Sequence, residues 1–390
     1  MTAKVWHIFI DETHVQTDLH GVFFCAIPVL KKELLQIPEK SKNTEEKDME
    51  TFLMYLLFVV GVVLIVKGGD WFVDGAVWVA EITGIPKFII GATIISLATT
   101  LPEIIVSTIA AIDGHQILNS GVADAVAASQ DKVGMAIGNG IGSVICNTAM
   151  ILAISAVFMP IAIKRKEFAP KAFLLLAAVV VLFLFSLSGS LPLAGAFVLL
   201  LVFALYIAEN IRSAKGQDEE EAAAPAKDKK SVILNLLRVI VGADAIVGGS
   251  QLLVNNASKI AASWGVSEAI IGVTIVAVGT SLPELVTAIS SVIKKQTSMS
   301  VGNVIGANVI DTTLILSVCS FVYGGKLPVS AQNIYLDFPV AILVTLVAAV
   351  PTIIRKKFSR WQGILLLLIY VAYLIVVTVG LNSYLSLFGK

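Results

Sequence analysis

Long apolar segments recur along most of the chain and are separated by short polar links. A helix needs about 20 mostly apolar residues to cross a bilayer. The pattern therefore predicts an all-α membrane protein with ten transmembrane helices, several of them interrupted by glycine or proline. The predicted spans are residues 52–80, 87–112, 133–158, 170–189, 192–211, 232–260, 268–293, 299–323, 334–354 and 362–381.

The composition agrees with a membrane protein. Of the 390 residues, 57% are hydrophobic and 14% are charged, and the mean hydropathy is +0.88. Soluble domains are about one-quarter charged. The formal net charge of zero gives no reason to expect a nucleic-acid partner. Three scattered cysteines, Cys25, Cys146 and Cys319, are too few for a disulfide framework or a metal cluster.

Positively charged residues are concentrated in every second link. The links after the first, third, fifth, seventh and ninth spans are basic, whereas the opposite links carry little beyond Lys132 and Lys326. Because basic links mark the cytoplasmic side, we expect a multi-pass protein of the cell membrane with both ends of its helical core outside. The basic residues concerned are Lys87, Lys164, Arg165, Lys166, Arg212, Lys215, Lys227, Lys229, Lys230, Lys294, Lys295, Arg355, Lys356, Lys357 and Arg360.

The two halves of the chain repeat one another. The segment "IIGATIISLATTLPE" (89–103) matches "IIGVTIVAVGTSLPE" (270–284) at an offset of 181 residues. A second pair, "GNGIGSVICNTAMIL" (138–152) and "GNVIGANVIDTTLIL" (302–316), matches at an offset of 164. Each half holds five predicted spans, and because five is odd the second copy enters the membrane upside down. The sequence thus predicts two inverted five-helix repeats, and transporters of this kind place their site near the bilayer midplane between the repeats.

This division gives four regions. Residues 49–211 are the first five-helix repeat, residues 212–231 a polar cytoplasmic linker, and residues 232–390 the second, inverted repeat. Residues 1–48 contain neither a span-length apolar run nor a signal-peptide pattern. We expect them to be a disordered N-terminal tail, or to precede a true start at Met49.

Each repeat places one glutamate inside an apolar run, where a charge is most costly. On a helix, residues three, four and seven apart share a face, so hydroxyl groups accompany each acid. The proline before each acid, Pro102 or Pro283, lacks an amide hydrogen and frees the carbonyl of Ala98 or Gly279. This set of oxygens suits a hard cation such as Ca²⁺. The two faces are Ser96, Thr99, Thr100 and Glu103 in the first copy, and Ala277, Thr280, Ser281 and Glu284 in the second.

The second matching pair adds polar residues at equivalent positions. Asn147 in the first copy corresponds to Asp311 in the second, and Ser143 lies one turn before the asparagine. A single glutamate beside a proline is also compatible with a simple helix kink, but the duplication on inverted halves favours a cation site. Glycines four residues apart predict close helix packing beside it. They are Gly138, Gly142, Gly302 and Gly306.

Two acids of the first span stand apart from this site. Asp70 and Asp74 lie toward its predicted cytoplasmic end, and Gln251 and Asn255 take the equivalent positions in the second repeat. We expect them to make structural hydrogen bonds.

The paired "TLPE" and "GTSLPE" segments, together with "GNGIGSVICN" and "GNVIGANVID", resemble the two α-repeats of the cation/Ca²⁺ exchanger superfamily. Asn147 in one copy and Asp311 in the other are similar to the prokaryotic Na⁺/Ca²⁺ exchangers. The resemblance covers about residues 50–383. It implies a secondary active antiporter, not an enzyme, that exchanges Na⁺ for Ca²⁺ by alternating access. Its partners are then the two transported ions and the bilayer, with no cofactor and no evident protein partner.

The resemblance also implies roles for individual residues. Glu103 and Glu284 ligate Ca²⁺ centrally, Thr99 and Thr280 assist through their backbone carbonyls, and the same site alternately takes Na⁺. The other implied ligands are Asn147 and Asp311 in the middle of the site and, for Na⁺, Ser96, Thr100, Ser143, Ala277 through its carbonyl, and Ser281.

Three departures from the family pattern qualify these roles. Ala98 begins the triplet that usually reads Gly-Thr-Ser, and Val144 stands where an asparagine usually follows Gly-Ser. Ala307 replaces a usual serine, which puts one peripheral Na⁺ site in question. The family resemblance suggests exchange of three Na⁺ for one Ca²⁺, which moves one net charge per cycle.

The same residues bear on three other functions. A Ca²⁺/H⁺ antiporter on this scaffold is the nearest alternative, because protons compete with metal for buried carboxylates. The hydroxyl-rich flanks and the neutral Asn147 favour Na⁺. An intramembrane hydrolase would need a nucleophile or metal that the histidines and cysteines do not supply, and a site occluded between repeats does not suit a channel.

Overall fold

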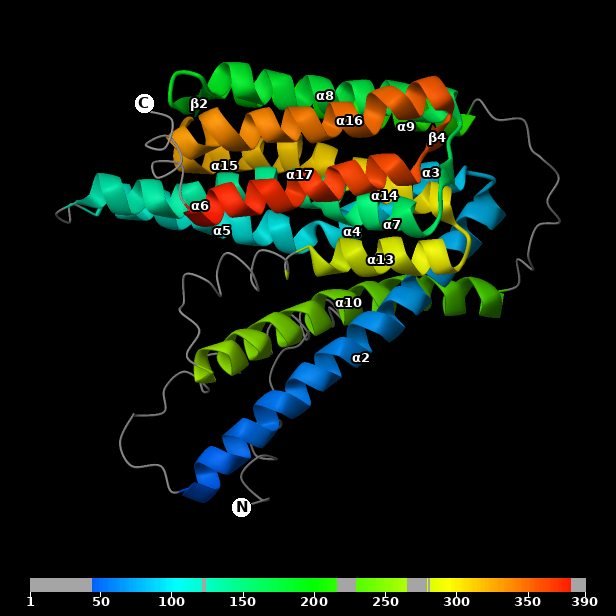
Figure 1. Cartoon of the computed structure of the whole chain (residues 1–390), viewed down its shortest axis with the longest axis horizontal. Coiled ribbons are helices and arrows are strands. Elements are labelled where there is room, and N and C mark those ends of the chain that lie inside the picture. Colours follow the sequence, from blue (N-terminus) through cyan, green and yellow to red (C-terminus); the bar gives the residue numbers. More distant parts are fainter. Residues whose placement is uncertain (1–43, 121–123, 216–228, 265–278, 280, 380–390) are drawn as a thin grey trace, which may run out of the picture. The chain divides into compact units, whose positions relative to one another are not determined.

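The structure is a computed structural model that describes residues 44–120, 124–215, 229–264, 279 and 281–379 (Figure 1). Residues 1–53 and 54–390 form separate compact units. Of the first unit only residues 44–53 are described, as the start of a helix. The predicted tail up to residue 43 and residues 216–228 of the predicted linker lie outside the described residues.

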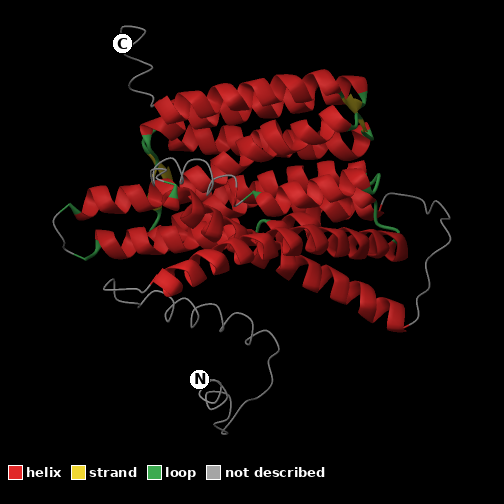
Figure 2. Cartoon of the chain, turned by 60° about the horizontal axis from the view of Figure 1, so that its bottom comes forward, coloured by secondary structure: helices red, strands yellow, loops and turns green. Residues whose placement is uncertain are grey.

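The described part of the first half of the chain is almost entirely helical (Figure 2). Its membrane segments are single helices or strings of α-helix and π-helix, in which π-helical turns are written η. In chain order they are α2 (Thr44–Thr83), α3 (Lys87–Ile90), η1 (Gly91–Ile95), α4 (Ser96–Thr99), α5 (Leu101–Leu118), α6 (Ala125–Cys146), η2 (Asn147–Leu152), α7 (Ala153–Phe158), α8 (Arg165–Ser186) and α9 (Leu193–Lys215).

The second half follows the same order where it is described. The segment equivalent to α3, η1 and α4 falls on residues 268–280, of which only Gly279 is described. The helices are α10 (Lys229–Ser263), α13 (Leu282–Ile293), α14 (Thr297–Val309), η4 (Ile310–Ile315), α15 (Leu316–Tyr323), η5 (Asn333–Asp337), α16 (Phe338–Arg355) and α17 (Arg360–Val379).

The described helices account for most of the predicted spans. Eight are long and apolar enough to cross a membrane, and the bent pair Lys87–Thr99 and Leu101–Leu118 makes a ninth. The shorter apolar helix Leu282–Ile293 is the described part of the predicted span 268–293. An all-helical multi-pass membrane protein is therefore confirmed, and the count of ten helices stays a prediction.

The prolines before the two glutamates occupy equivalent positions in both halves. Pro102 and Pro283 each occupy the first turn of a helix, α5 and α13. The residue that precedes each helix, Thr100 or Ser281, has nearly the same backbone angles, with φ −85° and ψ −3° against φ −88° and ψ 6°. In the first half this break bends the span by 46°. A missing amide hydrogen and the proline ring explain why the break recurs at equivalent residues.

Two helix strings form the centre of the unit. The buried share of the most apolar stretch is 72% in Ala125–Phe158 and 83% in Thr297–Tyr323. In α2 the same share is only 11%. Each changes from α-helix to π-helix where the second motif falls, with Asn147 beginning η2 and Asp311 lying in the first turn of η4. A π-turn inserts one residue into an α-helix and often marks a functional site.

Helices α2 and α10 cross one another (Figure 1), and equivalent glycines lie at their contact. A Cβ atom at Gly61 would come within 2.9 Å of the Gly249 carbonyl, and one at Gly242 within 2.9 Å of the Gly68 carbonyl. Gly61 and Gly68 correspond to Gly242 and Gly249 at the repeat offset of 181. The two helices thus meet backbone to backbone in a two-fold arrangement, because only glycine allows so close an approach.

Short strands join links from the two halves, which the sequence did not predict. Strand β1 (Ile161–Ala162) pairs antiparallel with β4 (Lys357–Phe358), and β2 (Ser190–Pro192) pairs antiparallel with β3 (Lys326–Pro328). The first sheet joins the links after the third and ninth predicted spans, and the second joins those after the fourth and eighth. Each pairing unites links that the charge pattern places on one side of the membrane.

Candidate ion-binding site

The two repeated glutamates are buried at the starts of helices from opposite halves. Glu103 lies in the first turn of α5 and Glu284 in the first turn of α13, and each is 1% exposed. A helix N-terminus carries a partial positive charge and favours an acid there. The Thr100 hydroxyl donates a hydrogen bond of 3.3 Å to Glu284 Oε1, so the first repeat contacts the acid of the second.

Asp311 and Asn147 lie at the same centre, on the two buried helix strings. Asp311 is fully buried and Asn147 is 1% exposed. Glu103 lies close enough to Glu284 and Asp311 to interact with both electrostatically. Helix string η2 packs against α13 and α14, and η4 packs against α5 and α6. The structure therefore brings the three predicted acids and the predicted amide together between the repeats.

Many oxygens of this centre have no hydrogen-bond partner among the described residues. A buried polar atom without a partner is costly, and native proteins leave few of them. None of the three acids forms an ion pair with a described lysine or arginine. We call these atoms the oxygen cluster: Glu103 Oε1 and Oε2, Asn147 Oδ1, Ser281 Oγ, Glu284 Oε2, Asn308 Oδ1, and Asp311 Oδ1 and Oδ2.

The cluster does not have the geometry of a compact metal site held by acidic, histidine or cysteine side chains. Among the described residues, no three such side chains converge closely enough to hold an ion by themselves. A cation here would need hydroxyl, amide or carbonyl oxygens as well, which is the set of ligands that Ca²⁺ and other hard cations accept.

The predicted hydroxyl ligands are buried next to the acids. The Thr100 hydroxyl donates to the Ser96 carbonyl at 2.6 Å, and the Thr99 hydroxyl donates to the same carbonyl at 3.3 Å. Hydroxyls that donate to backbone keep their oxygen lone pairs available for a cation. Ala277 and Thr280 lie outside the described residues. The buried predicted ligands with a hydroxyl are Ser96, Thr99, Thr100, Ser143 and Ser281.

The carbonyl of Gly279, one of the two that the prolines were expected to free, points to another helix. The Ser250 hydroxyl of α10 donates a hydrogen bond of 2.8 Å to it. The Gly279 carbonyl therefore bonds a protein hydroxyl, and its second lone pair can still accept another partner. The residue equivalent to Ser250 in the first repeat is Gly69, which has no hydroxyl to offer to Ala98.

Two asparagines that the sequence analysis did not single out hold the glutamate helices. Asn139 donates to the Ser107 hydroxyl at 2.9 Å, and Asn303 donates to the Thr287 hydroxyl at 2.9 Å. Asn303 also accepts a hydrogen bond of 3.4 Å from Thr99, across the repeats. Their signal in the sequence was the Gly-Asn pair that begins both copies of the second motif.

The close helix packing predicted at the glycines is present at Gly302 and Gly306 of the second copy. A Cβ at Gly302 or Gly306 would collide with the backbone of α3 or η1, at Phe88 and Ala92. At Gly138 and Gly142 no described residue lies within 4 Å of the Cβ position. The repeat assigns that contact to residues 269–273, which lie outside the described residues.

A buried tyrosine braces the π-turn before the first glutamate. The Tyr206 hydroxyl of α9 donates a hydrogen bond of 2.8 Å to the Ala92 carbonyl in η1. A π-turn leaves carbonyls that the regular α-helical pattern would have paired. Tyr206 supplies a donor for one of them, four residues before Ser96.

Comparison with known proteins identifies relatives over most of the chain. The family model described as sodium/calcium exchanger protein matches residues 53–211 and 234–379. An uncharacterized membrane protein of Methanocaldococcus jannaschii is 33% identical over 315 residues, which cover 80% of this chain and 94% of that protein. Sodium/calcium exchanger MaX1 of Methanosarcina acetivorans is 26% identical over 369 residues, which cover 83% of this chain and 97% of that protein.

Solved structures give the same result. A structure of the sodium-calcium exchanger NCX_Mj, soaked with Na⁺ and Sr²⁺, matches with a TM-score of 0.69 at 29% sequence identity. The match covers 83% of this chain and 98% of the exchanger. Both the sequence and the fold therefore match over nearly the whole length of these relatives.

Proposed function

This chain belongs to the sodium/calcium exchanger protein family, whose members are membrane transporters, and we propose that it exchanges Na⁺ for Ca²⁺ as a secondary active antiporter. The two ions bind alternately to one site between the inverted repeats, and the site opens to each side of the membrane in turn. In the proposed orientation the links after odd-numbered spans are cytoplasmic, and the two repeats are residues 49–211 and 232–390.

The oxygen cluster is the observation that carries this proposal. Three acids are buried within electrostatic reach of one another, and most of their oxygens accept no hydrogen bond from a described residue. Such an arrangement is stable only when a cation or protons balance the charge. Ca²⁺ needs six to eight oxygens, and carboxylates, amides and carbonyls supply them in proteins.

Each predicted ligand has a place in the proposed cycle. Glu103 and Glu284 hold Ca²⁺ from the two repeats, with the carbonyls of Thr99 and Thr280. Asn147 and Asp311 complete the middle of the site. Na⁺ uses the same acids together with Ser96, Thr100, Ser143, Ala277 through its carbonyl, and Ser281.

A Ca²⁺/H⁺ antiporter is the second candidate, because three neighbouring acids that pair with no described lysine or arginine also suit proton uptake. Five buried hydroxyl side chains around the acids favour Na⁺. These hydroxyls add neutral oxygens, which a Na⁺ site needs and a proton carrier does not.

Transport by the purified protein in liposomes decides between the two. Ca²⁺ uptake is measured with an outward Na⁺ gradient at equal pH, and separately with a pH gradient in the absence of Na⁺. We expect uptake with the Na⁺ gradient alone. Uptake driven only by the pH gradient would establish the second candidate, and uptake under neither gradient would refute both. Glu81→Gln serves as the control variant, because Glu81 is an exposed glutamate paired with Lys87, far along α2 from the site.

A further inference from the structure

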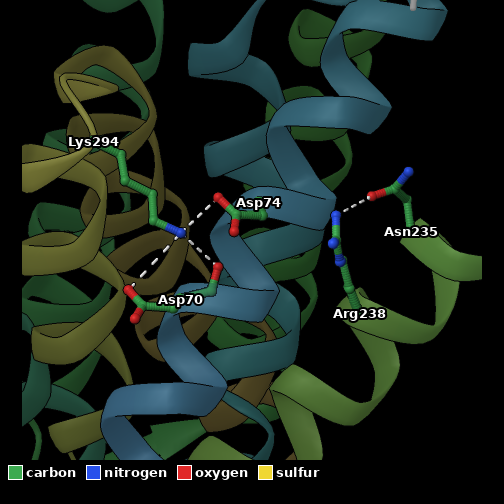
Figure 3. Close-up of polar contacts among 5 residues, drawn as sticks. All are labelled: Asp70, Asp74, Asn235, Arg238 and Lys294. Atoms are coloured by element: carbon green, nitrogen blue, oxygen red, sulfur yellow. Dashed lines mark hydrogen bonds and ion pairs between the residues drawn. The ribbon is translucent and has the colours of Figure 1, made fainter. Parts of the chain in front are cut away.

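Lys294 joins the two repeats at one end of the molecule (Figure 3). It follows the last residue of α13, in the second repeat, and reaches α2 in the first. Its ammonium group lies 2.6 Å from Asp74 Oδ1, 2.6 Å from the Asp70 carbonyl and 3.8 Å from Asp70 Oδ1. Asp70 and Asp74 are four residues apart and so share one face of α2. The expected hydrogen bonds of these acids are thus charged contacts between repeats.

The contact borders an open cavity of about 620 Å³. Lys294 is 23% exposed, whereas Asp70 and Asp74 are 43% and 49% exposed, so the pair forms at the edge of water. Lys67 also lines the cavity, but it belongs to α2 itself and its charge does not connect the repeats. On the other side of α2, Arg238 donates to Asn235 within its own helix α10 at 3.0 Å (Figure 3).

The inverted repeat has no ionic counterpart of this contact. At the offset of 181, Asp70, Asp74 and Lys294 correspond to Gln251, Asn255 and Asp113. An acid and two amides at these positions can form hydrogen bonds but no ion pair. The two ends of an otherwise repeated structure therefore differ in charge at equivalent positions.

We propose that Lys294 with Asp70 and Asp74 is an ionic latch that holds the cytoplasmic end closed and biases the exchanger toward its outward-open state. Alternating access requires contacts between the repeats to break at whichever end opens. A contact that exists in one state alone shifts the equilibrium by its own free energy. A partly exposed pair shifts it roughly two- to fivefold. The latch rests on the proposed antiport and on the proposed orientation.

The test measures Ca²⁺ affinity separately at the two faces, in inside-out and right-side-out vesicles. We expect Lys294→Gln to raise the apparent affinity at the cytoplasmic face roughly two- to fivefold and to lower it at the external face, because more of the protein opens inward. The double variant Lys294→Asp with Asp74→Lys should restore the wild-type ratio. Lys295→Gln is the matched control, since Lys295 makes no ion pair with any described residue.

A labelling experiment separates the latch from the transport function. Val77 lines the cavity, and a cysteine is placed there after the three native cysteines have been replaced. Lys294→Gln should accelerate its reaction with a membrane-impermeant maleimide from the cytoplasmic side, whether or not the protein transports Ca²⁺. Unchanged labelling together with an unchanged ratio of affinities at the two faces would overturn the latch, even if Na⁺/Ca²⁺ exchange were intact.

An ionic latch can also be built at the opposite end. Asp113→Lys with Asn255→Asp reproduces the charges of Lys294 and Asp74 at the equivalent positions. We expect this variant to shift the ratio of affinities in the same direction as Lys294→Gln, because a latch that closes the external end also favours the inward-open state. A shift toward the outward-open state would contradict the argument from charge asymmetry.

Discussion

The side-chain amide of Asn308 donates a hydrogen bond of 2.7 Å to the hydroxyl of Thr148, across the two repeats. At the offset of 164, these residues correspond to Val144 and Thr312. Val144 has no donor, and the Thr312 hydroxyl instead donates to the Asn308 carbonyl in its own half at 2.7 Å. Immediately beside Asn147, this hydrogen bond therefore runs from the second repeat to the first, and Val144 cannot donate the equivalent bond in the opposite direction.

We expect Asn308→Val to destabilise the protein by about 1 kcal/mol, because one buried hydrogen bond is lost. Adding Val144→Asn should recover part of this loss, since the new amide faces Thr312 as Asn308 faces Thr148. Thermal unfolding in detergent, compared among the two single variants and the double variant, measures the effect. A double variant less stable than Asn308→Val would show that the two positions are not interchangeable.

The second prediction concerns the glutamates. Glu103→Gln and Glu284→Gln should each abolish Ca²⁺ transport, because dehydrated Ca²⁺ then lacks a charged ligand that water cannot replace inside the membrane. Both proteins should fold, and without ions they should be at least as stable as the wild type, because repulsion between buried acids is relieved.

Unfolding with and without Ca²⁺ separates binding from folding. A ligand at 100 times its Kd stabilises the folded state by about 2.7 kcal/mol. The wild type should gain stability to this extent, and the glutamine variants should gain almost none. Near-normal transport by either variant would remove that glutamate from the site.

The sequence predicts those residues of the site that occur at equivalent positions in both repeats. Glu103 with Glu284, and Asn147 with Asp311, are matched pairs in apolar surroundings, and the structure places all four at one centre. Burying an acid in the membrane is costly, so an acid at the same buried position in both repeats indicates a functional role.

What is not duplicated could not be predicted. Ser250 reaches the Gly279 carbonyl from another helix, and its counterpart Gly69 offers no matching signal. Lys294 meets Asp70 and Asp74 only through tertiary packing, since 220 residues separate Lys294 from Asp74. The strand pairs between links likewise depend on how helices from different halves lie side by side.

The third prediction concerns the crossing of α2 and α10. A Cβ at Gly249 would lie 2.9 Å from both the Gly61 carbonyl and Leu64 Cβ. Gly249→Ala should therefore destabilise the protein by about 1–3 kcal/mol, as overpacking does. At the neighbouring Gly248, no described residue lies within 4 Å of the Cβ position. Gly248→Ala should be neutral or stabilise α10 by about 0.5–1 kcal/mol. Equal effects of the two substitutions on the unfolding temperature would argue against a close crossing.

The last prediction concerns the number of Na⁺ ions. The oxygen cluster contains three acids, Glu103, Glu284 and Asp311, and its other members, Asn147, Asn308 and Ser281, are neutral. Three Na⁺ balance three carboxylates, so exchange for one Ca²⁺ moves one net positive charge per cycle. Transport should then respond to voltage by about 2.3 kcal/mol per 100 mV. Reversal potentials measured in liposomes at fixed ion gradients give the ratio directly.

Ala307 is the residue on which this ratio depends. It is fully buried in α14 and has no hydroxyl, whereas its counterpart in the first repeat is Ser143. We expect another oxygen, from backbone or water, to hold the outer Na⁺, so that three ions still bind and exchange remains electrogenic. Ala307→Ser should then raise the apparent Na⁺ affinity without changing the reversal potential. If the wild type instead exchanges two Na⁺ per Ca²⁺ and ignores voltage, the missing hydroxyl has removed an ion site. In that case Ala307→Ser should shift the reversal potential toward the value for three Na⁺.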